Sequence, residues 1–223
     1  MLPTRDKIID AMEDRTNWPS ELQEYSTLEG FLSHPKYFQG GFALVFPLIR
    51  DNQKIALKIW YNDVENIAER MNFLAHFFNK NKFPFIINTC FYKNGFNVNG
   101  NLINALGTQW IDGLNLKEYT KKILEDNCAD CVKKRHLQVL ASKLNDVFRE
   151  MHKYNMSHGD LQHTNIMVDM SNNIKLIDYD SFYIPQMGVT PKITVGFPAY
   201  QHPTFKTLKL TNEKVDYFSE LII

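Results

Sequence analysis

The stretch Ser157-His-Gly-Asp-Leu-Gln-His-Thr-Asn165 decides how the rest of the chain is interpreted. Two apolar runs follow it, at 166–168 and 174–177, and they surround a turn rich in Asp, Asn and Ser. Short apolar runs around such a turn predict a β-hairpin. The hairpin would hold Asn165 at the start of one strand and Asp178 at the end of the other, so that both side chains face one pocket.

Three polar residues occur here in order: Asp160, Asn165 five residues later, and Asp178 after a further thirteen. An Asn and an Asp supply hard oxygen ligands to magnesium, and a second Asp orients or deprotonates the attacking hydroxyl in phosphoryl transfer. The pattern His-Gly-Asp-x4-Asn, followed by Ile-Asp-Tyr-Asp, resembles the catalytic loop and metal-binding segment of the protein-kinase superfamily, in the form of certain bacterial kinase-like domains. The simpler alternative is a pair of buried acids that cap turns in an ordinary α+β domain.

The resemblance implies an α+β, protein-kinase-like fold with two lobes. The N-lobe would be a five-stranded antiparallel sheet with one helix, and the C-lobe would be mainly helical. We expect an N-terminal extension (1–35) that packs on the N-lobe, the N-lobe itself (36–110) and the C-lobe (111–223). The chain ends soon after the expected helix that carries Asp216, so it is expected to be either a minimal kinase or a fragment.

Composition limits the other classes of function. With 223 residues, of which 44 % are apolar, the chain can bury a substantial core. Its formal net charge of zero argues against a nucleic-acid partner bound through a basic excess. No apolar run is as long as a membrane span, and the N-terminus lacks a secretory pattern. The three cysteines do not suggest a disulfide framework, which fits a cytoplasmic protein, and the oligomeric state stays open.

The segment Gln39-Gly-Gly-Phe-Ala-Leu-Val45 precedes two strand-like runs, 44–49 and 54–60. Glycines between extended segments let a backbone approach a phosphate closely. The segment has only part of the kinase glycine pattern, but Ala56-x-Lys58 follows it, as in the kinase strand whose lysine contacts the nucleotide phosphates. The resemblance therefore assigns the nucleotide to Gly40, Gly41, Val45, Ala56, Lys58, Thr108, Gln109, Ile111 and Met167.

Further elements are predicted on both sides of the nucleotide segments. A short helix begins at Thr4, and a helix over 63–80 would supply a glutamate partner for Lys58, either Glu69 or Glu65. Strands are expected at 83–92 and 101–110 around Lys93-Asn-Gly95. Helices are expected from residue 115 or 116, over about 131–154, and from Asp216, whose side chain would brace the catalytic loop.

The sequence thus predicts an ATP- and Mg²⁺-dependent phosphotransferase that acts on Ser/Thr hydroxyls of proteins. Its expected catalytic residues are Asp160, Lys58, Glu69, Asn165 and Asp178, of which Asn165 and Asp178 hold the metal. Two alternatives remain. The first is a small-molecule phosphotransferase of the aminoglycoside type, because such enzymes also carry His-Gly-Asp and because Gln162 stands where many protein kinases carry Lys. A non-catalytic nucleotide-binding scaffold is the other alternative. The segment 196–203, which resembles the substrate-docking end of a kinase activation segment, favours a protein acceptor.

The position between His158 and Asp160 gives an expectation about regulation. Many protein kinases carry an Arg there, which pairs with a phosphate on the activation segment. This chain has Gly159, and its segment from Ser181 to Thr194 offers Ser181, Thr190 and Thr194 as the only Ser/Thr hydroxyls. The sequence therefore predicts that activation-segment phosphorylation is not required.

Overall fold

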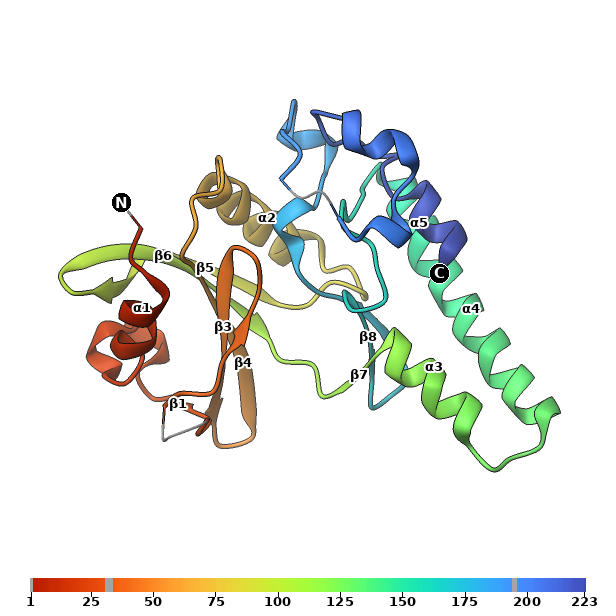
Figure 1. The fold of residues 1–223 in the computed structure, drawn as a ribbon, viewed down its shortest axis with the longest axis horizontal. Coiled ribbons are helices and arrows are strands. Elements are labelled where there is room, and N and C mark those ends of the chain that lie inside the picture. The colour runs from red at the N-terminus through yellow and green to blue at the C-terminus, as the bar shows by residue number, and fades with distance from the viewer. Residues whose placement is uncertain (1, 31–33, 194–195) are drawn as a thin grey trace. The chain divides into compact units, whose positions relative to one another are not determined.

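The structure is a computed structural model that describes residues 2–30, 34–193 and 196–223. The chain forms two compact units, which are described separately (Figure 1). The first unit contains Met1–Lys82 and Asn88–Trp110, and the second contains Phe83–Ile87 and Ile111–Ile223.

The first unit is built on a six-stranded antiparallel sheet in the order β1-β3-β4-β6-β5, with β2 paired to β3. Five strands were predicted, and the additional one, β1, comes from the N-terminal segment. The strands are β1 (Ser26–Thr27), β2 (Phe38–Gln39), β3 (Ala43–Arg50), β4 (Gln53–Trp60), β5 (Thr89–Val98) and β6 (Asn101–Gln109). The predicted α+β class with an antiparallel N-lobe sheet is confirmed.

One face of this sheet forms the core of the first unit. Alternate residues of β3 and β4, such as Phe46 and Leu57, are fully buried, as the period of two in a strand requires. The N-terminal helix α1 (Arg5–Ala11) contributes Ile8 to the same core, and Trp18, Leu22 and Tyr25 follow it there. Short 3₁₀ turns η1 (Arg15–Asn17) and η2 (Ser20–Leu22) connect α1 to β1. The predicted helix after Thr4 is present, but the Thr4 side chain makes no capping hydrogen bond.

The β5–β6 hairpin differs from the prediction in two ways. Residues 83–87 belong to the second unit, so β5 begins at Thr89 and not at residue 83. The turn lies at Asn99-Gly100, where both residues have positive φ angles, and not at 93–95. The chain contains Asn-Gly twice, and the first copy is absorbed as a register shift between Tyr92 and Phe96.

The helix of the first unit, α2 (Ile67–Asn81), starts four residues later than the predicted start at residue 63. Asn66 adopts a left-handed conformation at its N-cap, which separates Glu65 from the helix. Glu65 therefore lies outside the helix from which a partner for Lys58 was expected, and its pairing with Lys58 stays untested. The buried side of α2 carries Met71, Leu74, Ala75, Phe78 and, unexpectedly for a charged residue, Arg70.

The second unit combines a small sheet with helices. Strands β7 (Gly113–Asn115), β8 (Ile166–Asp169) and β9 (Ile174–Leu176) pair in that order. Helix α3 (Leu116–Glu125) begins at a capping box formed by Asn115 and Glu118, and this start agrees with the predicted one at residue 115 or 116. The long helix α4 (Asp130–Lys153) also matches its prediction, and α5 (Tyr217–Ile222) lies beside its C-terminal end (Figure 1). The chain between β9 and α5 forms η4 (Tyr179–Ser181), η5 (Pro185–Met187), η6 (Pro198–Tyr200) and η7 (Pro203–Thr207).

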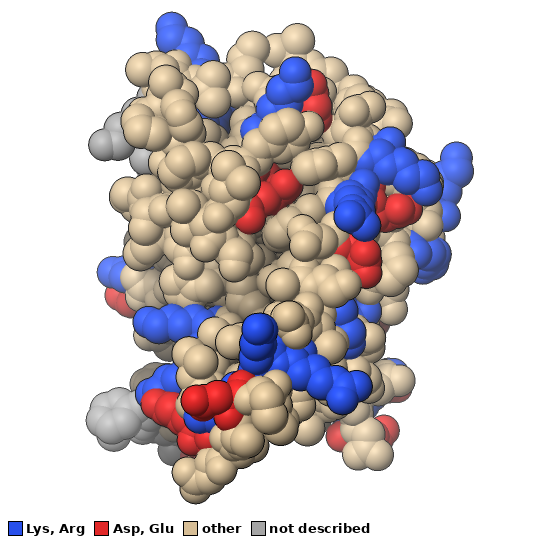
Figure 2. All heavy atoms as spheres, turned by 90° about the vertical axis from the view of Figure 1, so that its right-hand side faces the viewer, with Lys and Arg blue, Asp and Glu red and all other residues tan. Residues whose placement is uncertain are grey.

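Surface properties agree with the neutral composition. Figure 2 shows basic and acidic side chains interspersed on the face that it presents. Cys90, Cys128 and Cys131 are free thiols. Within the described residues, no helix combines the length and the apolar character that a membrane crossing needs.

Candidate active site

The predicted hairpin is present and brings its two polar ends together. Ile166 pairs with Leu176 in the β8–β9 register, and the Ile177 amide donates to the Asn165 carbonyl at 3.0 Å. Asn165 therefore directly precedes β8, and Asp178 leaves the hairpin beside it. Asp178 has a φ of +66°, a conformation that few non-glycine residues adopt. This backbone turns the chain sharply at the end of the hairpin.

Asp160 is held by two amide side chains. The Asn165 Nδ2 donates to the Asp160 carbonyl at 2.8 Å and to its Oδ2 at 3.3 Å, and the Gln162 Nε2 donates to Oδ2 at 3.4 Å. The other oxygen, Oδ1, is buried and has no hydrogen-bond partner among the described residues. Desolvation by burial raises the pKa of Asp160, the nearby His158 lowers it, and the charge of Asp178 raises it again. The result is a carboxylate with one oxygen held by two amide groups and the other buried without a hydrogen-bond partner among the described residues.

Asn165 and Asp178 offer oxygen donors for a metal ion. Because the Asn165 Nδ2 donates to Asp160, the Oδ1 of the same amide group is the atom that could ligate a metal ion. No group of three or more His, Cys, Asp or Glu residues in the described part of the chain is arranged to hold a metal. A magnesium ion fits such a sparse set, because magnesium is commonly held by one or two side chains together with substrate phosphates.

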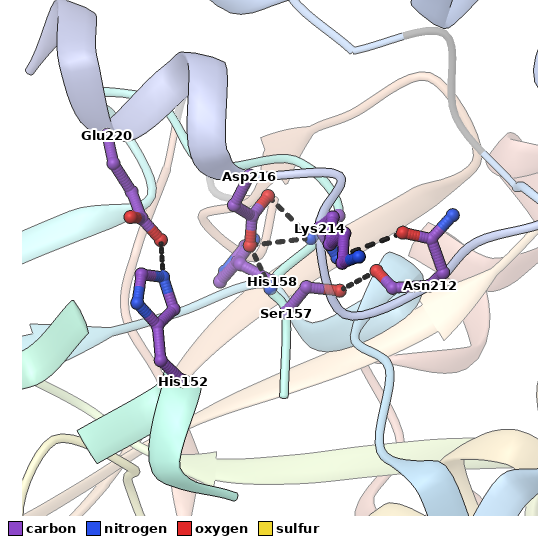
Figure 3. A network of polar contacts seen from close by, with 8 residues as sticks. His152, Ser157, His158, Asn212, Lys214, Asp216 and Glu220 are labelled. Carbon is purple, nitrogen blue, oxygen red and sulfur yellow. Dashed lines mark hydrogen bonds and ion pairs between the residues drawn. The ribbon is translucent and has the colours of Figure 1, made fainter. Parts of the chain in front are cut away.

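Asp216, at the start of α5, braces the backbone on the N-terminal side of Asp160. Its carboxylate accepts hydrogen bonds from the amides of His158 and Gly159, the latter at 3.0 Å to Oδ1 (Figure 3). Asp216 is 2 % exposed, and this burial raises its pKa to about 6 in spite of the two amide donors. The His158 ring contacts the Ile177 carbonyl at 2.8 Å, which ties the loop to the end of the hairpin.

Figure 3 shows two further contacts around this brace. The Ser157 Oγ donates to the Asn212 carbonyl at 2.8 Å, and His152 on α4 pairs with Glu220 on α5 at 2.9 Å. Both contacts join the segment that leads into Asp160 to the chain around α5. The helix expected to brace the catalytic loop is thus present, and it is itself fixed to α4.

Gly159 explains why no arginine stands between His158 and Asp160. Its φ is +76°, and a Cβ atom at this position would lie 2.3 Å from the Ser181 carbonyl oxygen. Any side chain there would displace the backbone of the following segment. Ser181 and Thr190 are both only 5 % exposed, and Thr194 lies outside the described residues.

The first unit places four of the predicted nucleotide residues on one face of its sheet. Val45 lies opposite Lys58 in the β3–β4 pair, and Ala56 lies opposite Thr108 in the β4–β6 pair. Residues two apart on a strand share a face, so all four side chains point to the same side. All four are half-buried, whereas the opposite face is core. The Lys58 Nζ lies 5.7 Å from the ring centroid of Trp60.

The glycine turn, residues 40–42 between β2 and β3, is fixed by two side chains that the sequence analysis missed. The Tyr61 hydroxyl donates to the Gly40 carbonyl at 2.6 Å, and the Asn62 Nδ2 donates to the Gly41 carbonyl at 3.0 Å. These residues directly follow β4, and only the β3–β4 register shows that they reach the turn. A Cβ atom added to Gly41 would meet no atom within 4 Å. No contact with the described residues therefore requires a glycine there.

The remaining predicted residues are described where each one lies. Glu69 is exposed in the first turn of α2, and its pairing with Lys58 stays a prediction. Gln109 is exposed, and its backbone amide donates to the Asn88 backbone carbonyl. Ile111 and Met167 belong to the second unit and are half-buried.

Comparison with known proteins gives one result that bears on this site. The family model of the protein kinase domain matches residues 36–223, which is most of the chain. No curated protein matches the chain. The matched range contains the glycine turn, the sheet face that carries Lys58, the catalytic loop and the Asp216 brace, and on this basis the chain belongs to the protein kinase family, whose members use ATP and a divalent metal ion to transfer a phosphoryl group.

Proposed function

We propose that this chain is a cytoplasmic, ATP- and Mg²⁺-dependent protein kinase of bacterial type that phosphorylates serine or threonine hydroxyls of proteins. The observation that carries the proposal is the environment of Asp160. One carboxylate oxygen is held by Asn165 and Gln162, and the other is buried with no hydrogen-bond partner among the described residues. This arrangement suits a group that receives and orients a hydroxyl, because positioning is a large part of catalysis in phosphoryl transfer.

The other residues of the second unit take complementary roles. Asn165 and Asp178 would hold the metal ion through their oxygens. Bound Mg²⁺ would neutralise charge on the nucleotide phosphates. The raised pKa of Asp160 brings its carboxylate nearer to the range in which it can accept a proton from the hydroxyl as the new bond forms.

The first unit would bind the nucleotide. Lys58 would contact the α- and β-phosphates with Glu69 as its partner, and Ala56 and Thr108 would line the adenine side of the same sheet face. The glycine turn would cover the phosphates. The open space at Gly41 supports this role, because a backbone without side chains leaves room for a phosphate. The division into an extension (1–35), an N-lobe (36–110) and a C-lobe (111–223) belongs to this proposal.

The choice of a protein acceptor depends on residues 196–203. This segment resembles the docking end of a kinase activation segment, which a small-molecule phosphotransferase would not need. Gln162 is the departure, since it brings no charge to a position where many protein kinases have Lys. Its hydrogen bond to Asp160 supports a positioning role in place of a charge contact with the γ-phosphate.

The test is transfer from γ-labelled ATP in the presence of Mg²⁺. Generic protein acceptors, a Tyr-containing copolymer and aminoglycosides are offered in parallel, and the labelled amino acid is identified. We expect label on Ser or Thr, and we expect Lys58→Ala to reduce both ATP-dependent thermal stabilisation and turnover. Label on an aminoglycoside, or Mg-ATP binding without any transfer, would replace the proposal by one of the two alternatives.

A further inference from the structure

A second contact holds the catalytic loop on the C-terminal side of Asp160, whereas the Asp216 brace holds it on the N-terminal side. The His163 Nδ1 lies 2.7 Å from the Tyr200 hydroxyl, within hydrogen-bond distance. The Phe197 ring meets the His163 ring edge-on, with centroids 6.2 Å apart and an interplanar angle of 87°. Both aromatic residues belong to the docking segment, residues 196–203. A direct side-chain contact therefore joins this segment to the catalytic loop.

The contact completes a series of hydrogen bonds that leaves the catalytic loop before Asp160 and returns to it after Asp160. The amides of His158 and Gly159 donate to Asp216 on α5. One helical turn later, the fully buried Ser219 donates through Oγ to the Tyr200 carbonyl at 2.7 Å. Tyr200 then returns to the catalytic loop through its hydroxyl.

His163 is fixed on its backbone as well. Its carbonyl accepts a hydrogen bond from the Leu116 amide at 3.1 Å, at the first residue of α3. The Tyr200 hydroxyl can donate to one tautomer of the His163 ring and accept from the other, so either tautomer keeps the contact. The loop is thus held at residues 158–159 by Asp216 and at residue 163 by Tyr200, and Asp160 lies between the two anchors.

We propose that His163 and Tyr200 are positioning residues that hold the docking segment against the catalytic loop and so align the acceptor hydroxyl with Asp160. The proposal rests on the proposed function. In this chain Gln162 replaces the lysine that many kinases carry in the catalytic loop, and the docking segment contacts that loop through Tyr200 and Phe197. The His163–Tyr200 pair supplies a side-chain link between the same two segments. A small misplacement of reacting groups costs much of the rate in phosphoryl transfer.

Four variants test the link. Tyr200→Phe removes one oxygen and keeps the ring, and His163→Ala removes the partner. Each is expected to lower kcat by roughly tenfold, the loss of about one hydrogen bond, with Mg-ATP affinity unchanged. The double variant should lose no more than either single variant, because both remove the same contact. His163→Asn places an amide nitrogen near the Nδ1 position and should restore most of kcat.

Matched controls are available on the surface of the same unit. Tyr217→Phe removes a tyrosine hydroxyl from the exposed side of α5, and His136→Ala removes an exposed histidine from α4. Both should retain wild-type kcat. Unchanged kcat in Tyr200→Phe, additive losses in the double variant, or equal losses in His163→Ala and His163→Asn would overturn the proposal.

A readout without turnover separates this proposal from the proposed function. The ¹⁵N signals of the His163 ring should shift in Tyr200→Phe and stay unchanged in Tyr217→Phe, and amide hydrogen exchange at residues 160–163 should become faster in Tyr200→Phe only. If the wild type transfers no phosphate to any acceptor while these changes occur, the proposed function fails and the link between the segments stands. If neither the ring signals nor the exchange rates change, the link itself is wrong.

Discussion

The glycine turn in the first unit and the catalytic loop in the second unit each contain a glycine, but the two glycines have opposite surroundings. A Cβ atom on Gly41 would meet nothing within 4 Å, whereas one on Gly159 would lie 2.3 Å from the Ser181 carbonyl oxygen. Gly159 also has a φ of +76°, in the left-handed region that favours glycine. The first glycine borders open space, and the second leaves room for the backbone of Ser181.

The two regions also differ in how they are held. The side chains that fix the glycine turn, Tyr61 and Asn62, lie 21 residues from the carbonyls they bind and belong to the end of the adjoining hairpin. The amides of the catalytic loop are bound by Asp216, which lies 58 residues from His158 and 57 from Gly159. The glycine turn thus depends on one hairpin, while the catalytic loop depends on tertiary contacts.

The largest expected effect concerns the two acids of the catalytic region. Asp160→Asn should lower kcat by roughly 10²–10⁴-fold, the usual range for a lost general base, and keep Mg-ATP binding. Asp178→Asn should instead lose Mg²⁺-dependent nucleotide binding, because the metal would lose its carboxylate. Titration calorimetry with and without Mg²⁺, beside a turnover assay, separates the two outcomes. Transfer by Asp160→Asn at the wild-type rate would contradict kinase chemistry at this loop.

The comparison of glycines predicts the next largest effect. Gly159→Ala should lower the free energy of unfolding by about 3 kcal/mol, from left-handed strain and the contact with Ser181. Gly41→Ala should change it by less than about 1 kcal/mol. The same Gly41 variant should weaken Mg-ATP binding by roughly tenfold, since its methyl group would occupy the open space. Denaturant unfolding and ATP titration of both variants check the pair, and equal losses of stability would remove the distinction.

The burial of Asp216 predicts a pH dependence of stability. Its pKa rises from 3.8 to about 6 on folding, so the folded protein binds more protons than the unfolded chain between these values. Its contribution to stability is therefore greatest below about pH 4 and falls as the pH rises to about 6. The difference in unfolding free energy between wild type and Asp216→Asn should fall over this window by an amount on the order of 3 kcal/mol. A flat difference from pH 4 to 6 would show that the ionisation of Asp216 is not linked to folding.

The smallest expected effect concerns phosphorylation of the segment after Asp178. Gly159 provides no positive charge for a phosphate, and Ser181 and Thr190 are buried. Phosphatase treatment should therefore change the activity by less than about twofold. This effect is no larger than that expected of a surface substitution that leaves stability almost unchanged. A triple alanine variant at Ser181, Thr190 and Thr194 is assayed beside it. A large and parallel loss in both samples would show that a phosphate is needed in spite of Gly159.

Local signals in the sequence predicted several elements correctly. The β8–β9 hairpin followed from two apolar runs around a polar turn, and α3 begins where Asn115 and Glu118 form a capping box. The sequence could not place the turn of the β5–β6 hairpin, because Asn-Gly occurs at 94–95 and again at 99–100. In the folded chain the turn forms at the second of these sites. The backbone amide of Asn94 donates to the Asn104 side-chain oxygen within a bulge.

The sequence by itself determined the family and the identity of the groups available for chemistry, since Asp160, Asn165 and Asp178 occur at recognisable spacings. Only the tertiary structure decided that Gly159 packs on the Ser181 backbone and that Tyr200 reaches His163. These contacts join residues that lie 22 and 37 positions apart. Outside α-helices and β-strands, no repeating pattern in the sequence specifies which residues will meet when segments pack together.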